Sequence, residues 1–146
     1  MRRLIVAALA ALSAGCLALP VYAQSSAPGP FNTVEGKLEF VRADEGFAAM
    51  LDHVTLDRFQ SHTLIHFDEA ADAHENVARM LVQTDAGPVL YDFRSHPPRV
   101  LQAGRRLTVR RVFWQGDEVV MQSSQGWFRF ERGTLTKLQS STTTYH

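Results

Sequence analysis

The stretch from His62 to Glu75, HTLIHFDEAADAHE, contains three histidines and four carboxylates, which are residue types that bind metal ions. His62 and His66 are four residues apart, so they share one side of a helix, as zinc ligands on helices do, and they also share one face of a strand. His74 or a nearby carboxylate could supply a third ligand. The sequence therefore offers His62, His66 and His74 as candidate ligands for zinc or copper.

The same stretch also has an ordinary structural interpretation. Acids followed by alanines suit the first turn of a short helix over Asp68–Glu75, and histidines beside acids are common on the solvated face of such a helix. The glutamate that follows the first histidine in the zinc-protease helix is absent, because Thr63 stands there. We favour this interpretation, which requires no cofactor, and keep a divalent-metal-binding protein that uses His62 and His66 as an alternative.

Motifs for catalysis are scarce in the chain. There is no G-x-S-x-G elbow and no glycine-rich phosphate loop, and the single cysteine, Cys16, lies in an N-terminal leader. Ser61 and His62 with nearby acids match the residue types of a hydrolase triad, but their spacing implies no geometry. A small cavity enzyme could instead use Asp92 or His96 on the inner wall of a cupped sheet. The sequence favours a non-enzymatic protein and leaves this enzyme as an alternative.

The first 23 residues have the layout of a secretory signal peptide. Two arginines precede an apolar run from Leu4 to Leu19, and Val21-Tyr22-Ala23 offers a cleavage site after Ala23. The run is short for a transmembrane span of about 20 residues. A lipoprotein processed at Cys16 is less favoured, because no large aliphatic residue stands three positions before it. We therefore expect a periplasmic or secreted protein with no transmembrane segment after cleavage.

The remaining chain has the length of one domain. Residues 24–32 are polar and broken by prolines, which indicates a disordered lead, and residues 140–146 form a polar tail. Residues 33–139 are then a single globular domain rich in β-structure, with no internal repeat and no long linker.

Alternating residues predict several strands, and two segments have helical features. Asp44 resembles a helix N-cap, with apolar residues at helical spacing up to Val54, and the second helix is Asp68–Glu75. The alternation slips at Arg110, where a bulge would return Val112 to the core. The predicted strands are Val34–Val41, Ala78–Thr84 and Val89–Arg94 as a hairpin, Arg105–Trp114, Glu118–Gln122, Trp127–Glu131 and Thr134–Leu138.

These elements predict an α+β fold that is mostly antiparallel β-sheet, with one or two short helices. Two architectures fit: a small, partly open OB-like barrel, or a curved meander sheet. The stretch LQAGRRLTVRRVFWQGDEVV resembles the glycine-strand-turn-strand ending of small OB barrels, and the resemblance is limited to these generic strand signals.

Charge is distributed unevenly along the chain. Twelve of the fifteen acidic residues lie between Glu35 and Asp92, against four basic residues, whereas the chain from Arg94 onward has nine basic residues, Arg94 included, against three acids. The two halves carry about −8 and +6, which a neutral total conceals. Either the two halves fold together and pair their charges, which we favour, or the basic strands dock something anionic.

The basic half also contains a candidate binding surface. Arg106 and Arg110 alternate with apolar residues in one predicted strand, and Trp127 and Arg129 alternate with Phe128 in another. If the polar faces lie side by side, the arginines surround an indole that could stack and contact anions. The opposite assignment places Trp127 in the core.

The function that these observations favour is that of an exported, non-enzymatic binding module. Its partner would be a protein or an anionic envelope component, as for an inhibitor or immunity protein or an envelope adaptor. Nucleic acid is not expected, because an exported protein seldom meets it. The metal-binding protein and the cavity enzyme are the alternatives.

Overall fold

The computed structural model describes residues 24–74 and 76–138, and all regular structure in this part of the chain is β-sheet. The predicted signal peptide and polar tail lie outside the described residues. No helix long and apolar enough to cross a membrane occurs within these two ranges. The strands are β2 (Phe31–Thr33), β3 (Gly36–Ala43), β4 (Gly46–Leu51), β5 (Val54–Gln60), β6 (His66–Ala70), β7 (Val77–Thr84), β8 (Gly87–Asp92), β9 (Arg99–Gln102), β10 (Val109–Gln115), β11 (Glu118–Ser123), β12 (Gly126–Glu131) and β13 (Thr134–Lys137).

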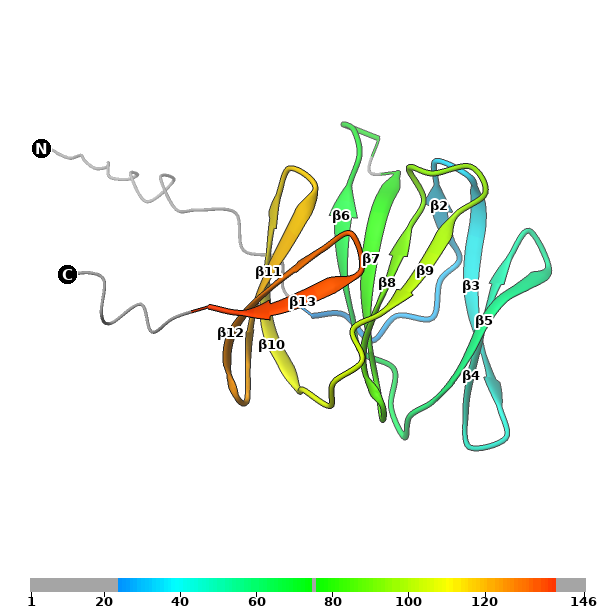
Figure 1. The fold of residues 1–146 in the computed structure, drawn as a ribbon. Coiled ribbons are helices and arrows are strands. Elements are labelled where there is room, and N and C mark those ends of the chain that lie inside the picture. Colours follow the sequence, from blue (N-terminus) through cyan, green and yellow to red (C-terminus); the bar gives the residue numbers. More distant parts are fainter. Residues whose placement is uncertain (1–23, 75, 139–146) are drawn as a thin grey trace, which may run out of the picture.

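The strands form two sheets (Figure 1). A barrel-like sheet of eight strands has the order β5-β4-β3-β2-β7-β8-β9. Strand β6 lies outside this order and pairs with β7 from Val77 to Val82. Its pairs are antiparallel except for β2 and β7, which run parallel where Thr33 pairs with Val77. Strands β10 to β13 form a separate antiparallel meander, which packs against the back of β6–β9.

Two apolar cores share the central strands β7 and β8. Met80 and Tyr91 point into the barrel-like sheet, toward Phe40 and its neighbours on β3–β5. Leu81 and Leu90 point the other way and pack against the meander. Because successive side chains of a strand alternate between faces, both strands supply a residue to each core in turn. Every residue of β8 is buried as a result.

The prediction of an α+β fold with one or two helices is wrong, because the described residues form an all-β structure. The first of the predicted helices is the hairpin of β4 and β5. Asp44 has a φ of 52°, so it opens a tight turn rather than capping a helix. Asp52 and His53 have φ values of 50° and 67°, as a two-residue hairpin turn requires. Strand β4 pairs with β3 on one side and with β5 on the other. The helical spacing of apolar residues in this segment was therefore coincidental, because both neighbours need its backbone groups.

The second predicted helix, Asp68–Glu75, is also wrong over the part that the structure describes. Asp68 to Ala70 belong to β6, which pairs with β7. The acids that suggested a helix start have other partners: Asp68 contacts His66 and Glu69 binds Arg79. The carboxylate of Asp72 accepts hydrogen bonds from the backbone of a turn instead of capping a helix.

The small barrel and most of the predicted strands are confirmed. β7 and β8 form the predicted hairpin, and a register shift between Val109 and Arg111 marks the predicted bulge, which leaves Val112 fully buried. The stretch that resembles an OB ending is different in one respect. The two strands that follow Gly104, β10 and β11, both belong to the meander, whereas β9 before it belongs to the barrel-like sheet, so Gly104 lies in the connection between the two sheets.

Residues 24–32, for which the sequence predicts a disordered lead, lie in the structure between β6 and β3. Ser25 exchanges backbone hydrogen bonds of 2.8 and 2.9 Å with His66 of β6, and the Phe40 N–H of β3 donates to the Pro28 carbonyl at 2.8 Å. The segment then continues into β2. It therefore fills the place between two strands of the barrel-like sheet that do not pair with each other.

Three hairpin turns share the pattern Ser/Thr-x-x-Gly. In the β7–β8 turn the Thr84 hydroxyl donates to the Gly87 carbonyl at 2.6 Å and accepts from the Ala86 N–H at 3.1 Å. The same bonds recur in the turns that begin at Thr33 and Ser123. The final glycines have φ values of +146°, +118° and +116°, which side chains rarely adopt. These short motifs fix the ends of the strands.

Gly87→Ala is expected to lower the free energy of unfolding by at least ~2 kcal/mol. A Cβ atom here would overlap the Arg105 carbonyl oxygen, in addition to the strain of a φ of +118°. Gly104→Ala is the matched control, since its φ is +77° but a Cβ meets nothing within 4 Å, and it should cost about 1 kcal/mol. Urea unfolding measures both. Equal losses would show that close approach to Arg105 does not matter.

Candidate functional site

The three candidate histidines lie in different environments. His66 is fully buried, and its ring nitrogens lie 2.6 Å from Asp68 Oδ1 and 2.8 Å from the Ala27 carbonyl oxygen. His62 and His74 are both exposed, in a bend and a turn. Among residues 24–74 and 76–138, no three His, Cys, Asp or Glu side chains gather in a way that could hold a metal ion.

The buried side chain of His66 is surrounded by packing and hydrogen-bonding partners. Its ring stacks on Phe40, with centroids 5.5 Å apart, and meets the edge of Phe31 at 5.2 Å. The contact with Ala27 ties the N-terminal segment to β6 at the same place as the backbone pairing of Ser25. The expectation that His62 and His66 share a face assumed one regular element, whereas the chain from Ser61 to Ile65 is neither helix nor strand.

The residues considered for a cavity enzyme do not line the inside of the barrel-like sheet. Asp92 lies on the face of β8 that is turned toward the meander and binds Arg94. The His96 side chain is 86% exposed, with Nδ1 2.6 Å from Glu35 Oε1. The interior is filled by the first apolar core, where Tyr91 donates a hydrogen bond of 2.8 Å to Asp57 Oδ2. Burial, together with Asp57, raises the pKa of the Tyr91 hydroxyl, which keeps it a neutral donor.

The outward side of the meander carries an aromatic pair. Phe128 and Phe130 on β12 are buried. Trp127 and Arg129 alternate with them along the strand and therefore point outward. The rings of Trp127 and Phe113 lie 5.7 Å apart at an angle of 33°. We define the outer face of the meander by its six outward residues at the centre of β10, β11 and β12, namely Arg111, Phe113, Val120, Gln122, Trp127 and Arg129.

The strand register arranges the outer face in cross-strand rows. Gln122 pairs with both Arg111 and Trp127, and the neighbouring row joins Phe113, Val120 and Arg129. Aromatic, aliphatic and guanidinium groups therefore lie next to one another on a flat surface. All three apolar members are partly exposed. The composition is that of a docking surface rather than of a solvated sheet face, which is ordinarily polar.

The other two arginines that the sequence proposed lie apart from this arrangement. Arg106 precedes β10 and borders grooves between the two sheets, where its carbonyl accepts a hydrogen bond from Gln125. Arg110 is exposed at the bulge of β10. The bulge shifts the alternation by one residue, so Arg111 and Phe113 face outward. Neither residue was among the candidates predicted from the sequence, although the predicted bulge implies this shift.

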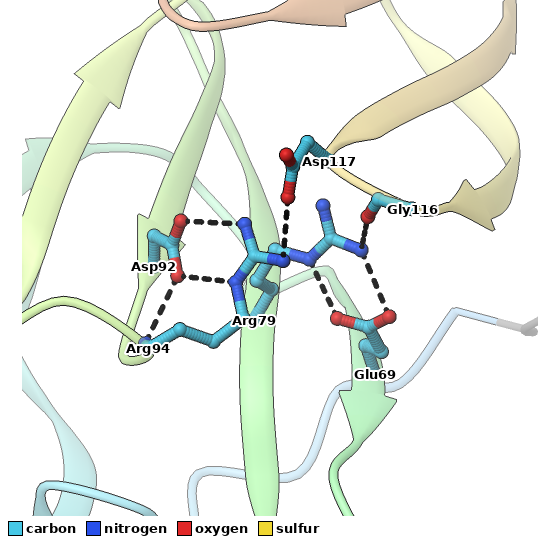
Figure 2. Close-up of polar contacts among 6 residues, drawn as sticks. All are labelled: Glu69, Arg79, Asp92, Arg94, Gly116 and Asp117. Carbon is cyan, nitrogen blue, oxygen red and sulfur yellow. Dashed lines mark hydrogen bonds and ion pairs between the residues drawn. The ribbon is translucent and has the colours of Figure 1, made fainter.

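A second polar arrangement lies between the sheets (Figure 2). The Arg79 side chain is 1% exposed and binds Glu69 with two hydrogen bonds, of 2.6 Å from Nε and 2.8 Å from Nη2. Nη2 also donates to the Gly116 carbonyl oxygen at 2.8 Å. The guanidinium lies over the ring of Trp114, 4.9 Å from its centroid. This arginine thus joins the barrel-like sheet to the first hairpin turn of the meander.

Arg94 makes a parallel connection. It donates to Asp92 from Nε and Nη2, both at 2.9 Å, and from Nη1 to Asp117 at 3.3 Å. Burial opposes the ionisation of Asp92, but the hydrogen bonds from Arg94 outweigh it and hold the pKa of this carboxyl below its usual value. The same bonds raise the pKa of the Arg94 guanidinium. Both groups are therefore charged at neutral pH.

The charges of the two halves mostly do not neutralise each other. Among the ion pairs of the described residues, only Asp92 with Arg94 and Glu35 with His96 join the acidic half to the basic half. The remaining pairs lie within one half, as Glu69 with Arg79 does. The favoured prediction of charge pairing between the halves therefore describes only a small part of the contacts.

Comparison of the chain with models of known families, with curated proteins and with solved structures finds no match. No relative therefore indicates a function, and the surfaces of the molecule are the observations from which one can be proposed.

His66→Ala is expected to lower the free energy of unfolding by about 2–4 kcal/mol. The change leaves a cavity beside Phe40 and removes the bond to Ala27, so limited proteolysis should also cut faster within residues 24–30. His62→Ala is the matched control and should change stability by less than about 0.5 kcal/mol, because its side chain is exposed. A loss of similar size in both variants would contradict the structural role of His66.

Asp92→Asn is expected to lower the free energy of unfolding at pH 7 by about 1–3 kcal/mol, because Arg94 loses the more buried of its two charged partners and keeps only the exposed Asp117. The folded pKa of Asp92 lies below the usual 3.8. Its contribution is therefore fully present above that value and is lost as the pH falls through the folded pKa. The difference between wild type and variant should shrink between pH 5 and 2 in urea unfolding. Parallel curves across that range would exclude the proposed pair.

Proposed function

We propose that this protein is an exported, non-enzymatic binding module whose outer face docks an acidic protein surface. The observation that carries the proposal is the pair of Phe113 and Trp127, partly exposed on a sheet face between Arg111 and Arg129. Exported location is part of the proposal and rests on the leader sequence before Ala23.

A protein partner suits the shape and composition of the outer face. The face is a sheet surface, which offers area rather than the concave pocket that a small molecule usually needs. Tryptophan and arginine are the residue types most enriched in binding hot spots, where an aromatic centre is surrounded by polar groups. The centre here is Trp127 with Phe113 and Val120, and the surrounding polar groups are Arg111, Gln122 and Arg129.

The charge distribution supports an acidic partner. Arg111 is exposed and has no carboxylate partner among the described residues. The side chain of Arg129 is 43% exposed, and its Nε lies 3.5 Å from Glu118 Oε1. The half of the chain that begins at Arg94 carries about +6. Such a surplus accelerates encounter with an acidic surface and discriminates against a basic one. An inhibitor or immunity protein and an envelope adaptor both fit this description.

The proposal predicts contact-specific crosslinking. A photoreactive amino acid at Gln122, between Arg111 and Trp127 on the outer face, should crosslink an acidic protein in cells, and the same residue at Arg58 in the acidic half should not. With the captured partner purified, Trp127→Ala should weaken binding by about 30-fold or more, as hot-spot tryptophans do. Arg58→Ala, an exposed arginine on β5, is the control and should leave affinity unchanged.

Three outcomes would contradict the proposal. The Gln122 position could crosslink no more than the Arg58 position, it could crosslink lipid instead of protein, or Trp127→Ala could retain full affinity. The variants are interpretable because Trp127 contributes no buried core contact, whereas Phe128 beside it does.

A further inference from the structure

A cleft of about 380 Å³ lies where two hairpin turns of the meander approach β8 and β9. Its polar side chains are Asp92, Arg94, Ser95, Arg99, Asp117 and Arg132, and Leu90 and Leu101 supply apolar surface. Three arginines, just after β8, at the start of β9 and in the turn between β12 and β13, therefore border one space. This cleft lies between the sheets and shares no residue with the outer face.

The cleft has more arginines than carboxylates, and two of the arginines form no ion pair among the described residues. Arg94 is held by Asp92 and Asp117 and so has partners. Arg99 and Arg132 have no carboxylate within 4 Å among the described residues, although both border the same space. Both residues are exposed, and the cleft residues carry one more positive than negative charge, which favours an anion as the ligand.

Two buried hydrogen-bond donors lie next to the cleft without lining it, since Arg79 on β7 pairs with Asp92 on β8 and its guanidinium lies over Trp114. Arg79, 1% exposed, uses Nε and Nη2, but its Nη1 has no acceptor in the described chain, and Trp114 Nε1 is likewise buried without one. Figure 2 shows the guanidinium of Arg79 beside that of Arg94, with Nη1 on the side away from Glu69. Buried donors of this kind are rare, because each leaves its desolvation uncompensated.

We infer that this cleft binds a phosphate group carried by a small organic molecule. The planar fork of arginine matches phosphate oxygens, and the two forks that have no carboxylate partner, those of Arg99 and Arg132, can bind more oxygens than the two that a carboxylate offers. Ser95 adds a hydroxyl donor. The volume exceeds that of a phosphate ion, so the rest of the molecule has room beside Leu90 and Leu101. The inference is independent of the outer face.

Calorimetric titration at constant ionic strength tests the inference. Glycerol 3-phosphate should bind saturably at one site, more tightly than inorganic phosphate, and glycerol should not bind. Each phosphate ligand should also raise the melting temperature, as ligands of the folded state do. The double variant Arg99→Ala/Arg132→Ala should weaken binding at least tenfold, whereas Arg58→Ala and Arg111→Ala, which remove exposed arginines elsewhere, should not.

The same variants distinguish a free phosphate ester from a lipid headgroup. Vesicles containing phosphatidic acid should bind through Arg99 and Arg132 if a headgroup enters the cleft, and only the soluble ester should do so if the ligand is free. The inference is overturned if glycerol 3-phosphate shows no saturable binding, if sodium sulfate and chloride bind equally well, or if the double variant binds as the wild type does. Because Trp127→Ala should leave phosphate binding intact, failure of the outer-face proposal gives a separate result.

Discussion

The layer of β6 to β9 is covered on both faces, and the rest of the structure depends on this constraint. The barrel-like sheet curves over one face and the meander covers the other, so every residue of β8 is buried. A strand in this position must supply apolar side chains in both directions, as Tyr91 and Leu90 do. It must also provide a partner for every polar side chain that it carries inward.

The charged groups between the sheets follow from that requirement. Arg79 on β7 and Asp92 on β8 lie opposite each other in the strand register, and both are buried. Glu69 and Arg94 supply the opposite charges. Replacing such a network by apolar residues often costs no stability, so its physical effect is directional. Apolar contacts fix no orientation, whereas the bonds from Arg79 to Gly116 and from Arg94 to Asp117 hold one hairpin turn of the meander in place.

Local patterns in the sequence predict the strands well and the turns poorly. Alternation finds the β7–β8 hairpin and the bulge near Arg110, because period-two burial needs no knowledge of distant residues. Asp44 was misread because Asp suits both a helix N-cap and a left-handed turn, and only the pairing of β4 with β3 and β5 decides between them. The Ser/Thr-x-x-Gly turns are visible in the sequence, but none of them lies within the two segments that were predicted as helices.

The candidate sites were partly predictable for the same reason. Trp127 and Arg129 were proposed as an exposed pair, but alternation alone does not say which face of β12 is buried; the position of Phe128 in the second core does. The outward direction of Arg111 depends on the exact residue at which the strand bulges, which the sequence alone did not fix. The pairing of Glu69 with Arg79 depends on the register between β6 and β7, which no local pattern contains.

The outer face of the meander is not required by the fold, which is the strongest argument that it has another use. The meander buries its inner side against β6–β9, and its outer side needs only polar residues to be soluble. Phe113, Val120 and Trp127 stabilise no core there. The basic charges around them are likewise not consumed by the acidic half, since only two ion pairs join the halves among the described residues. Apolar area and unpaired charge on one surface both cost free energy in the isolated protein, and a complementary partner removes both costs together.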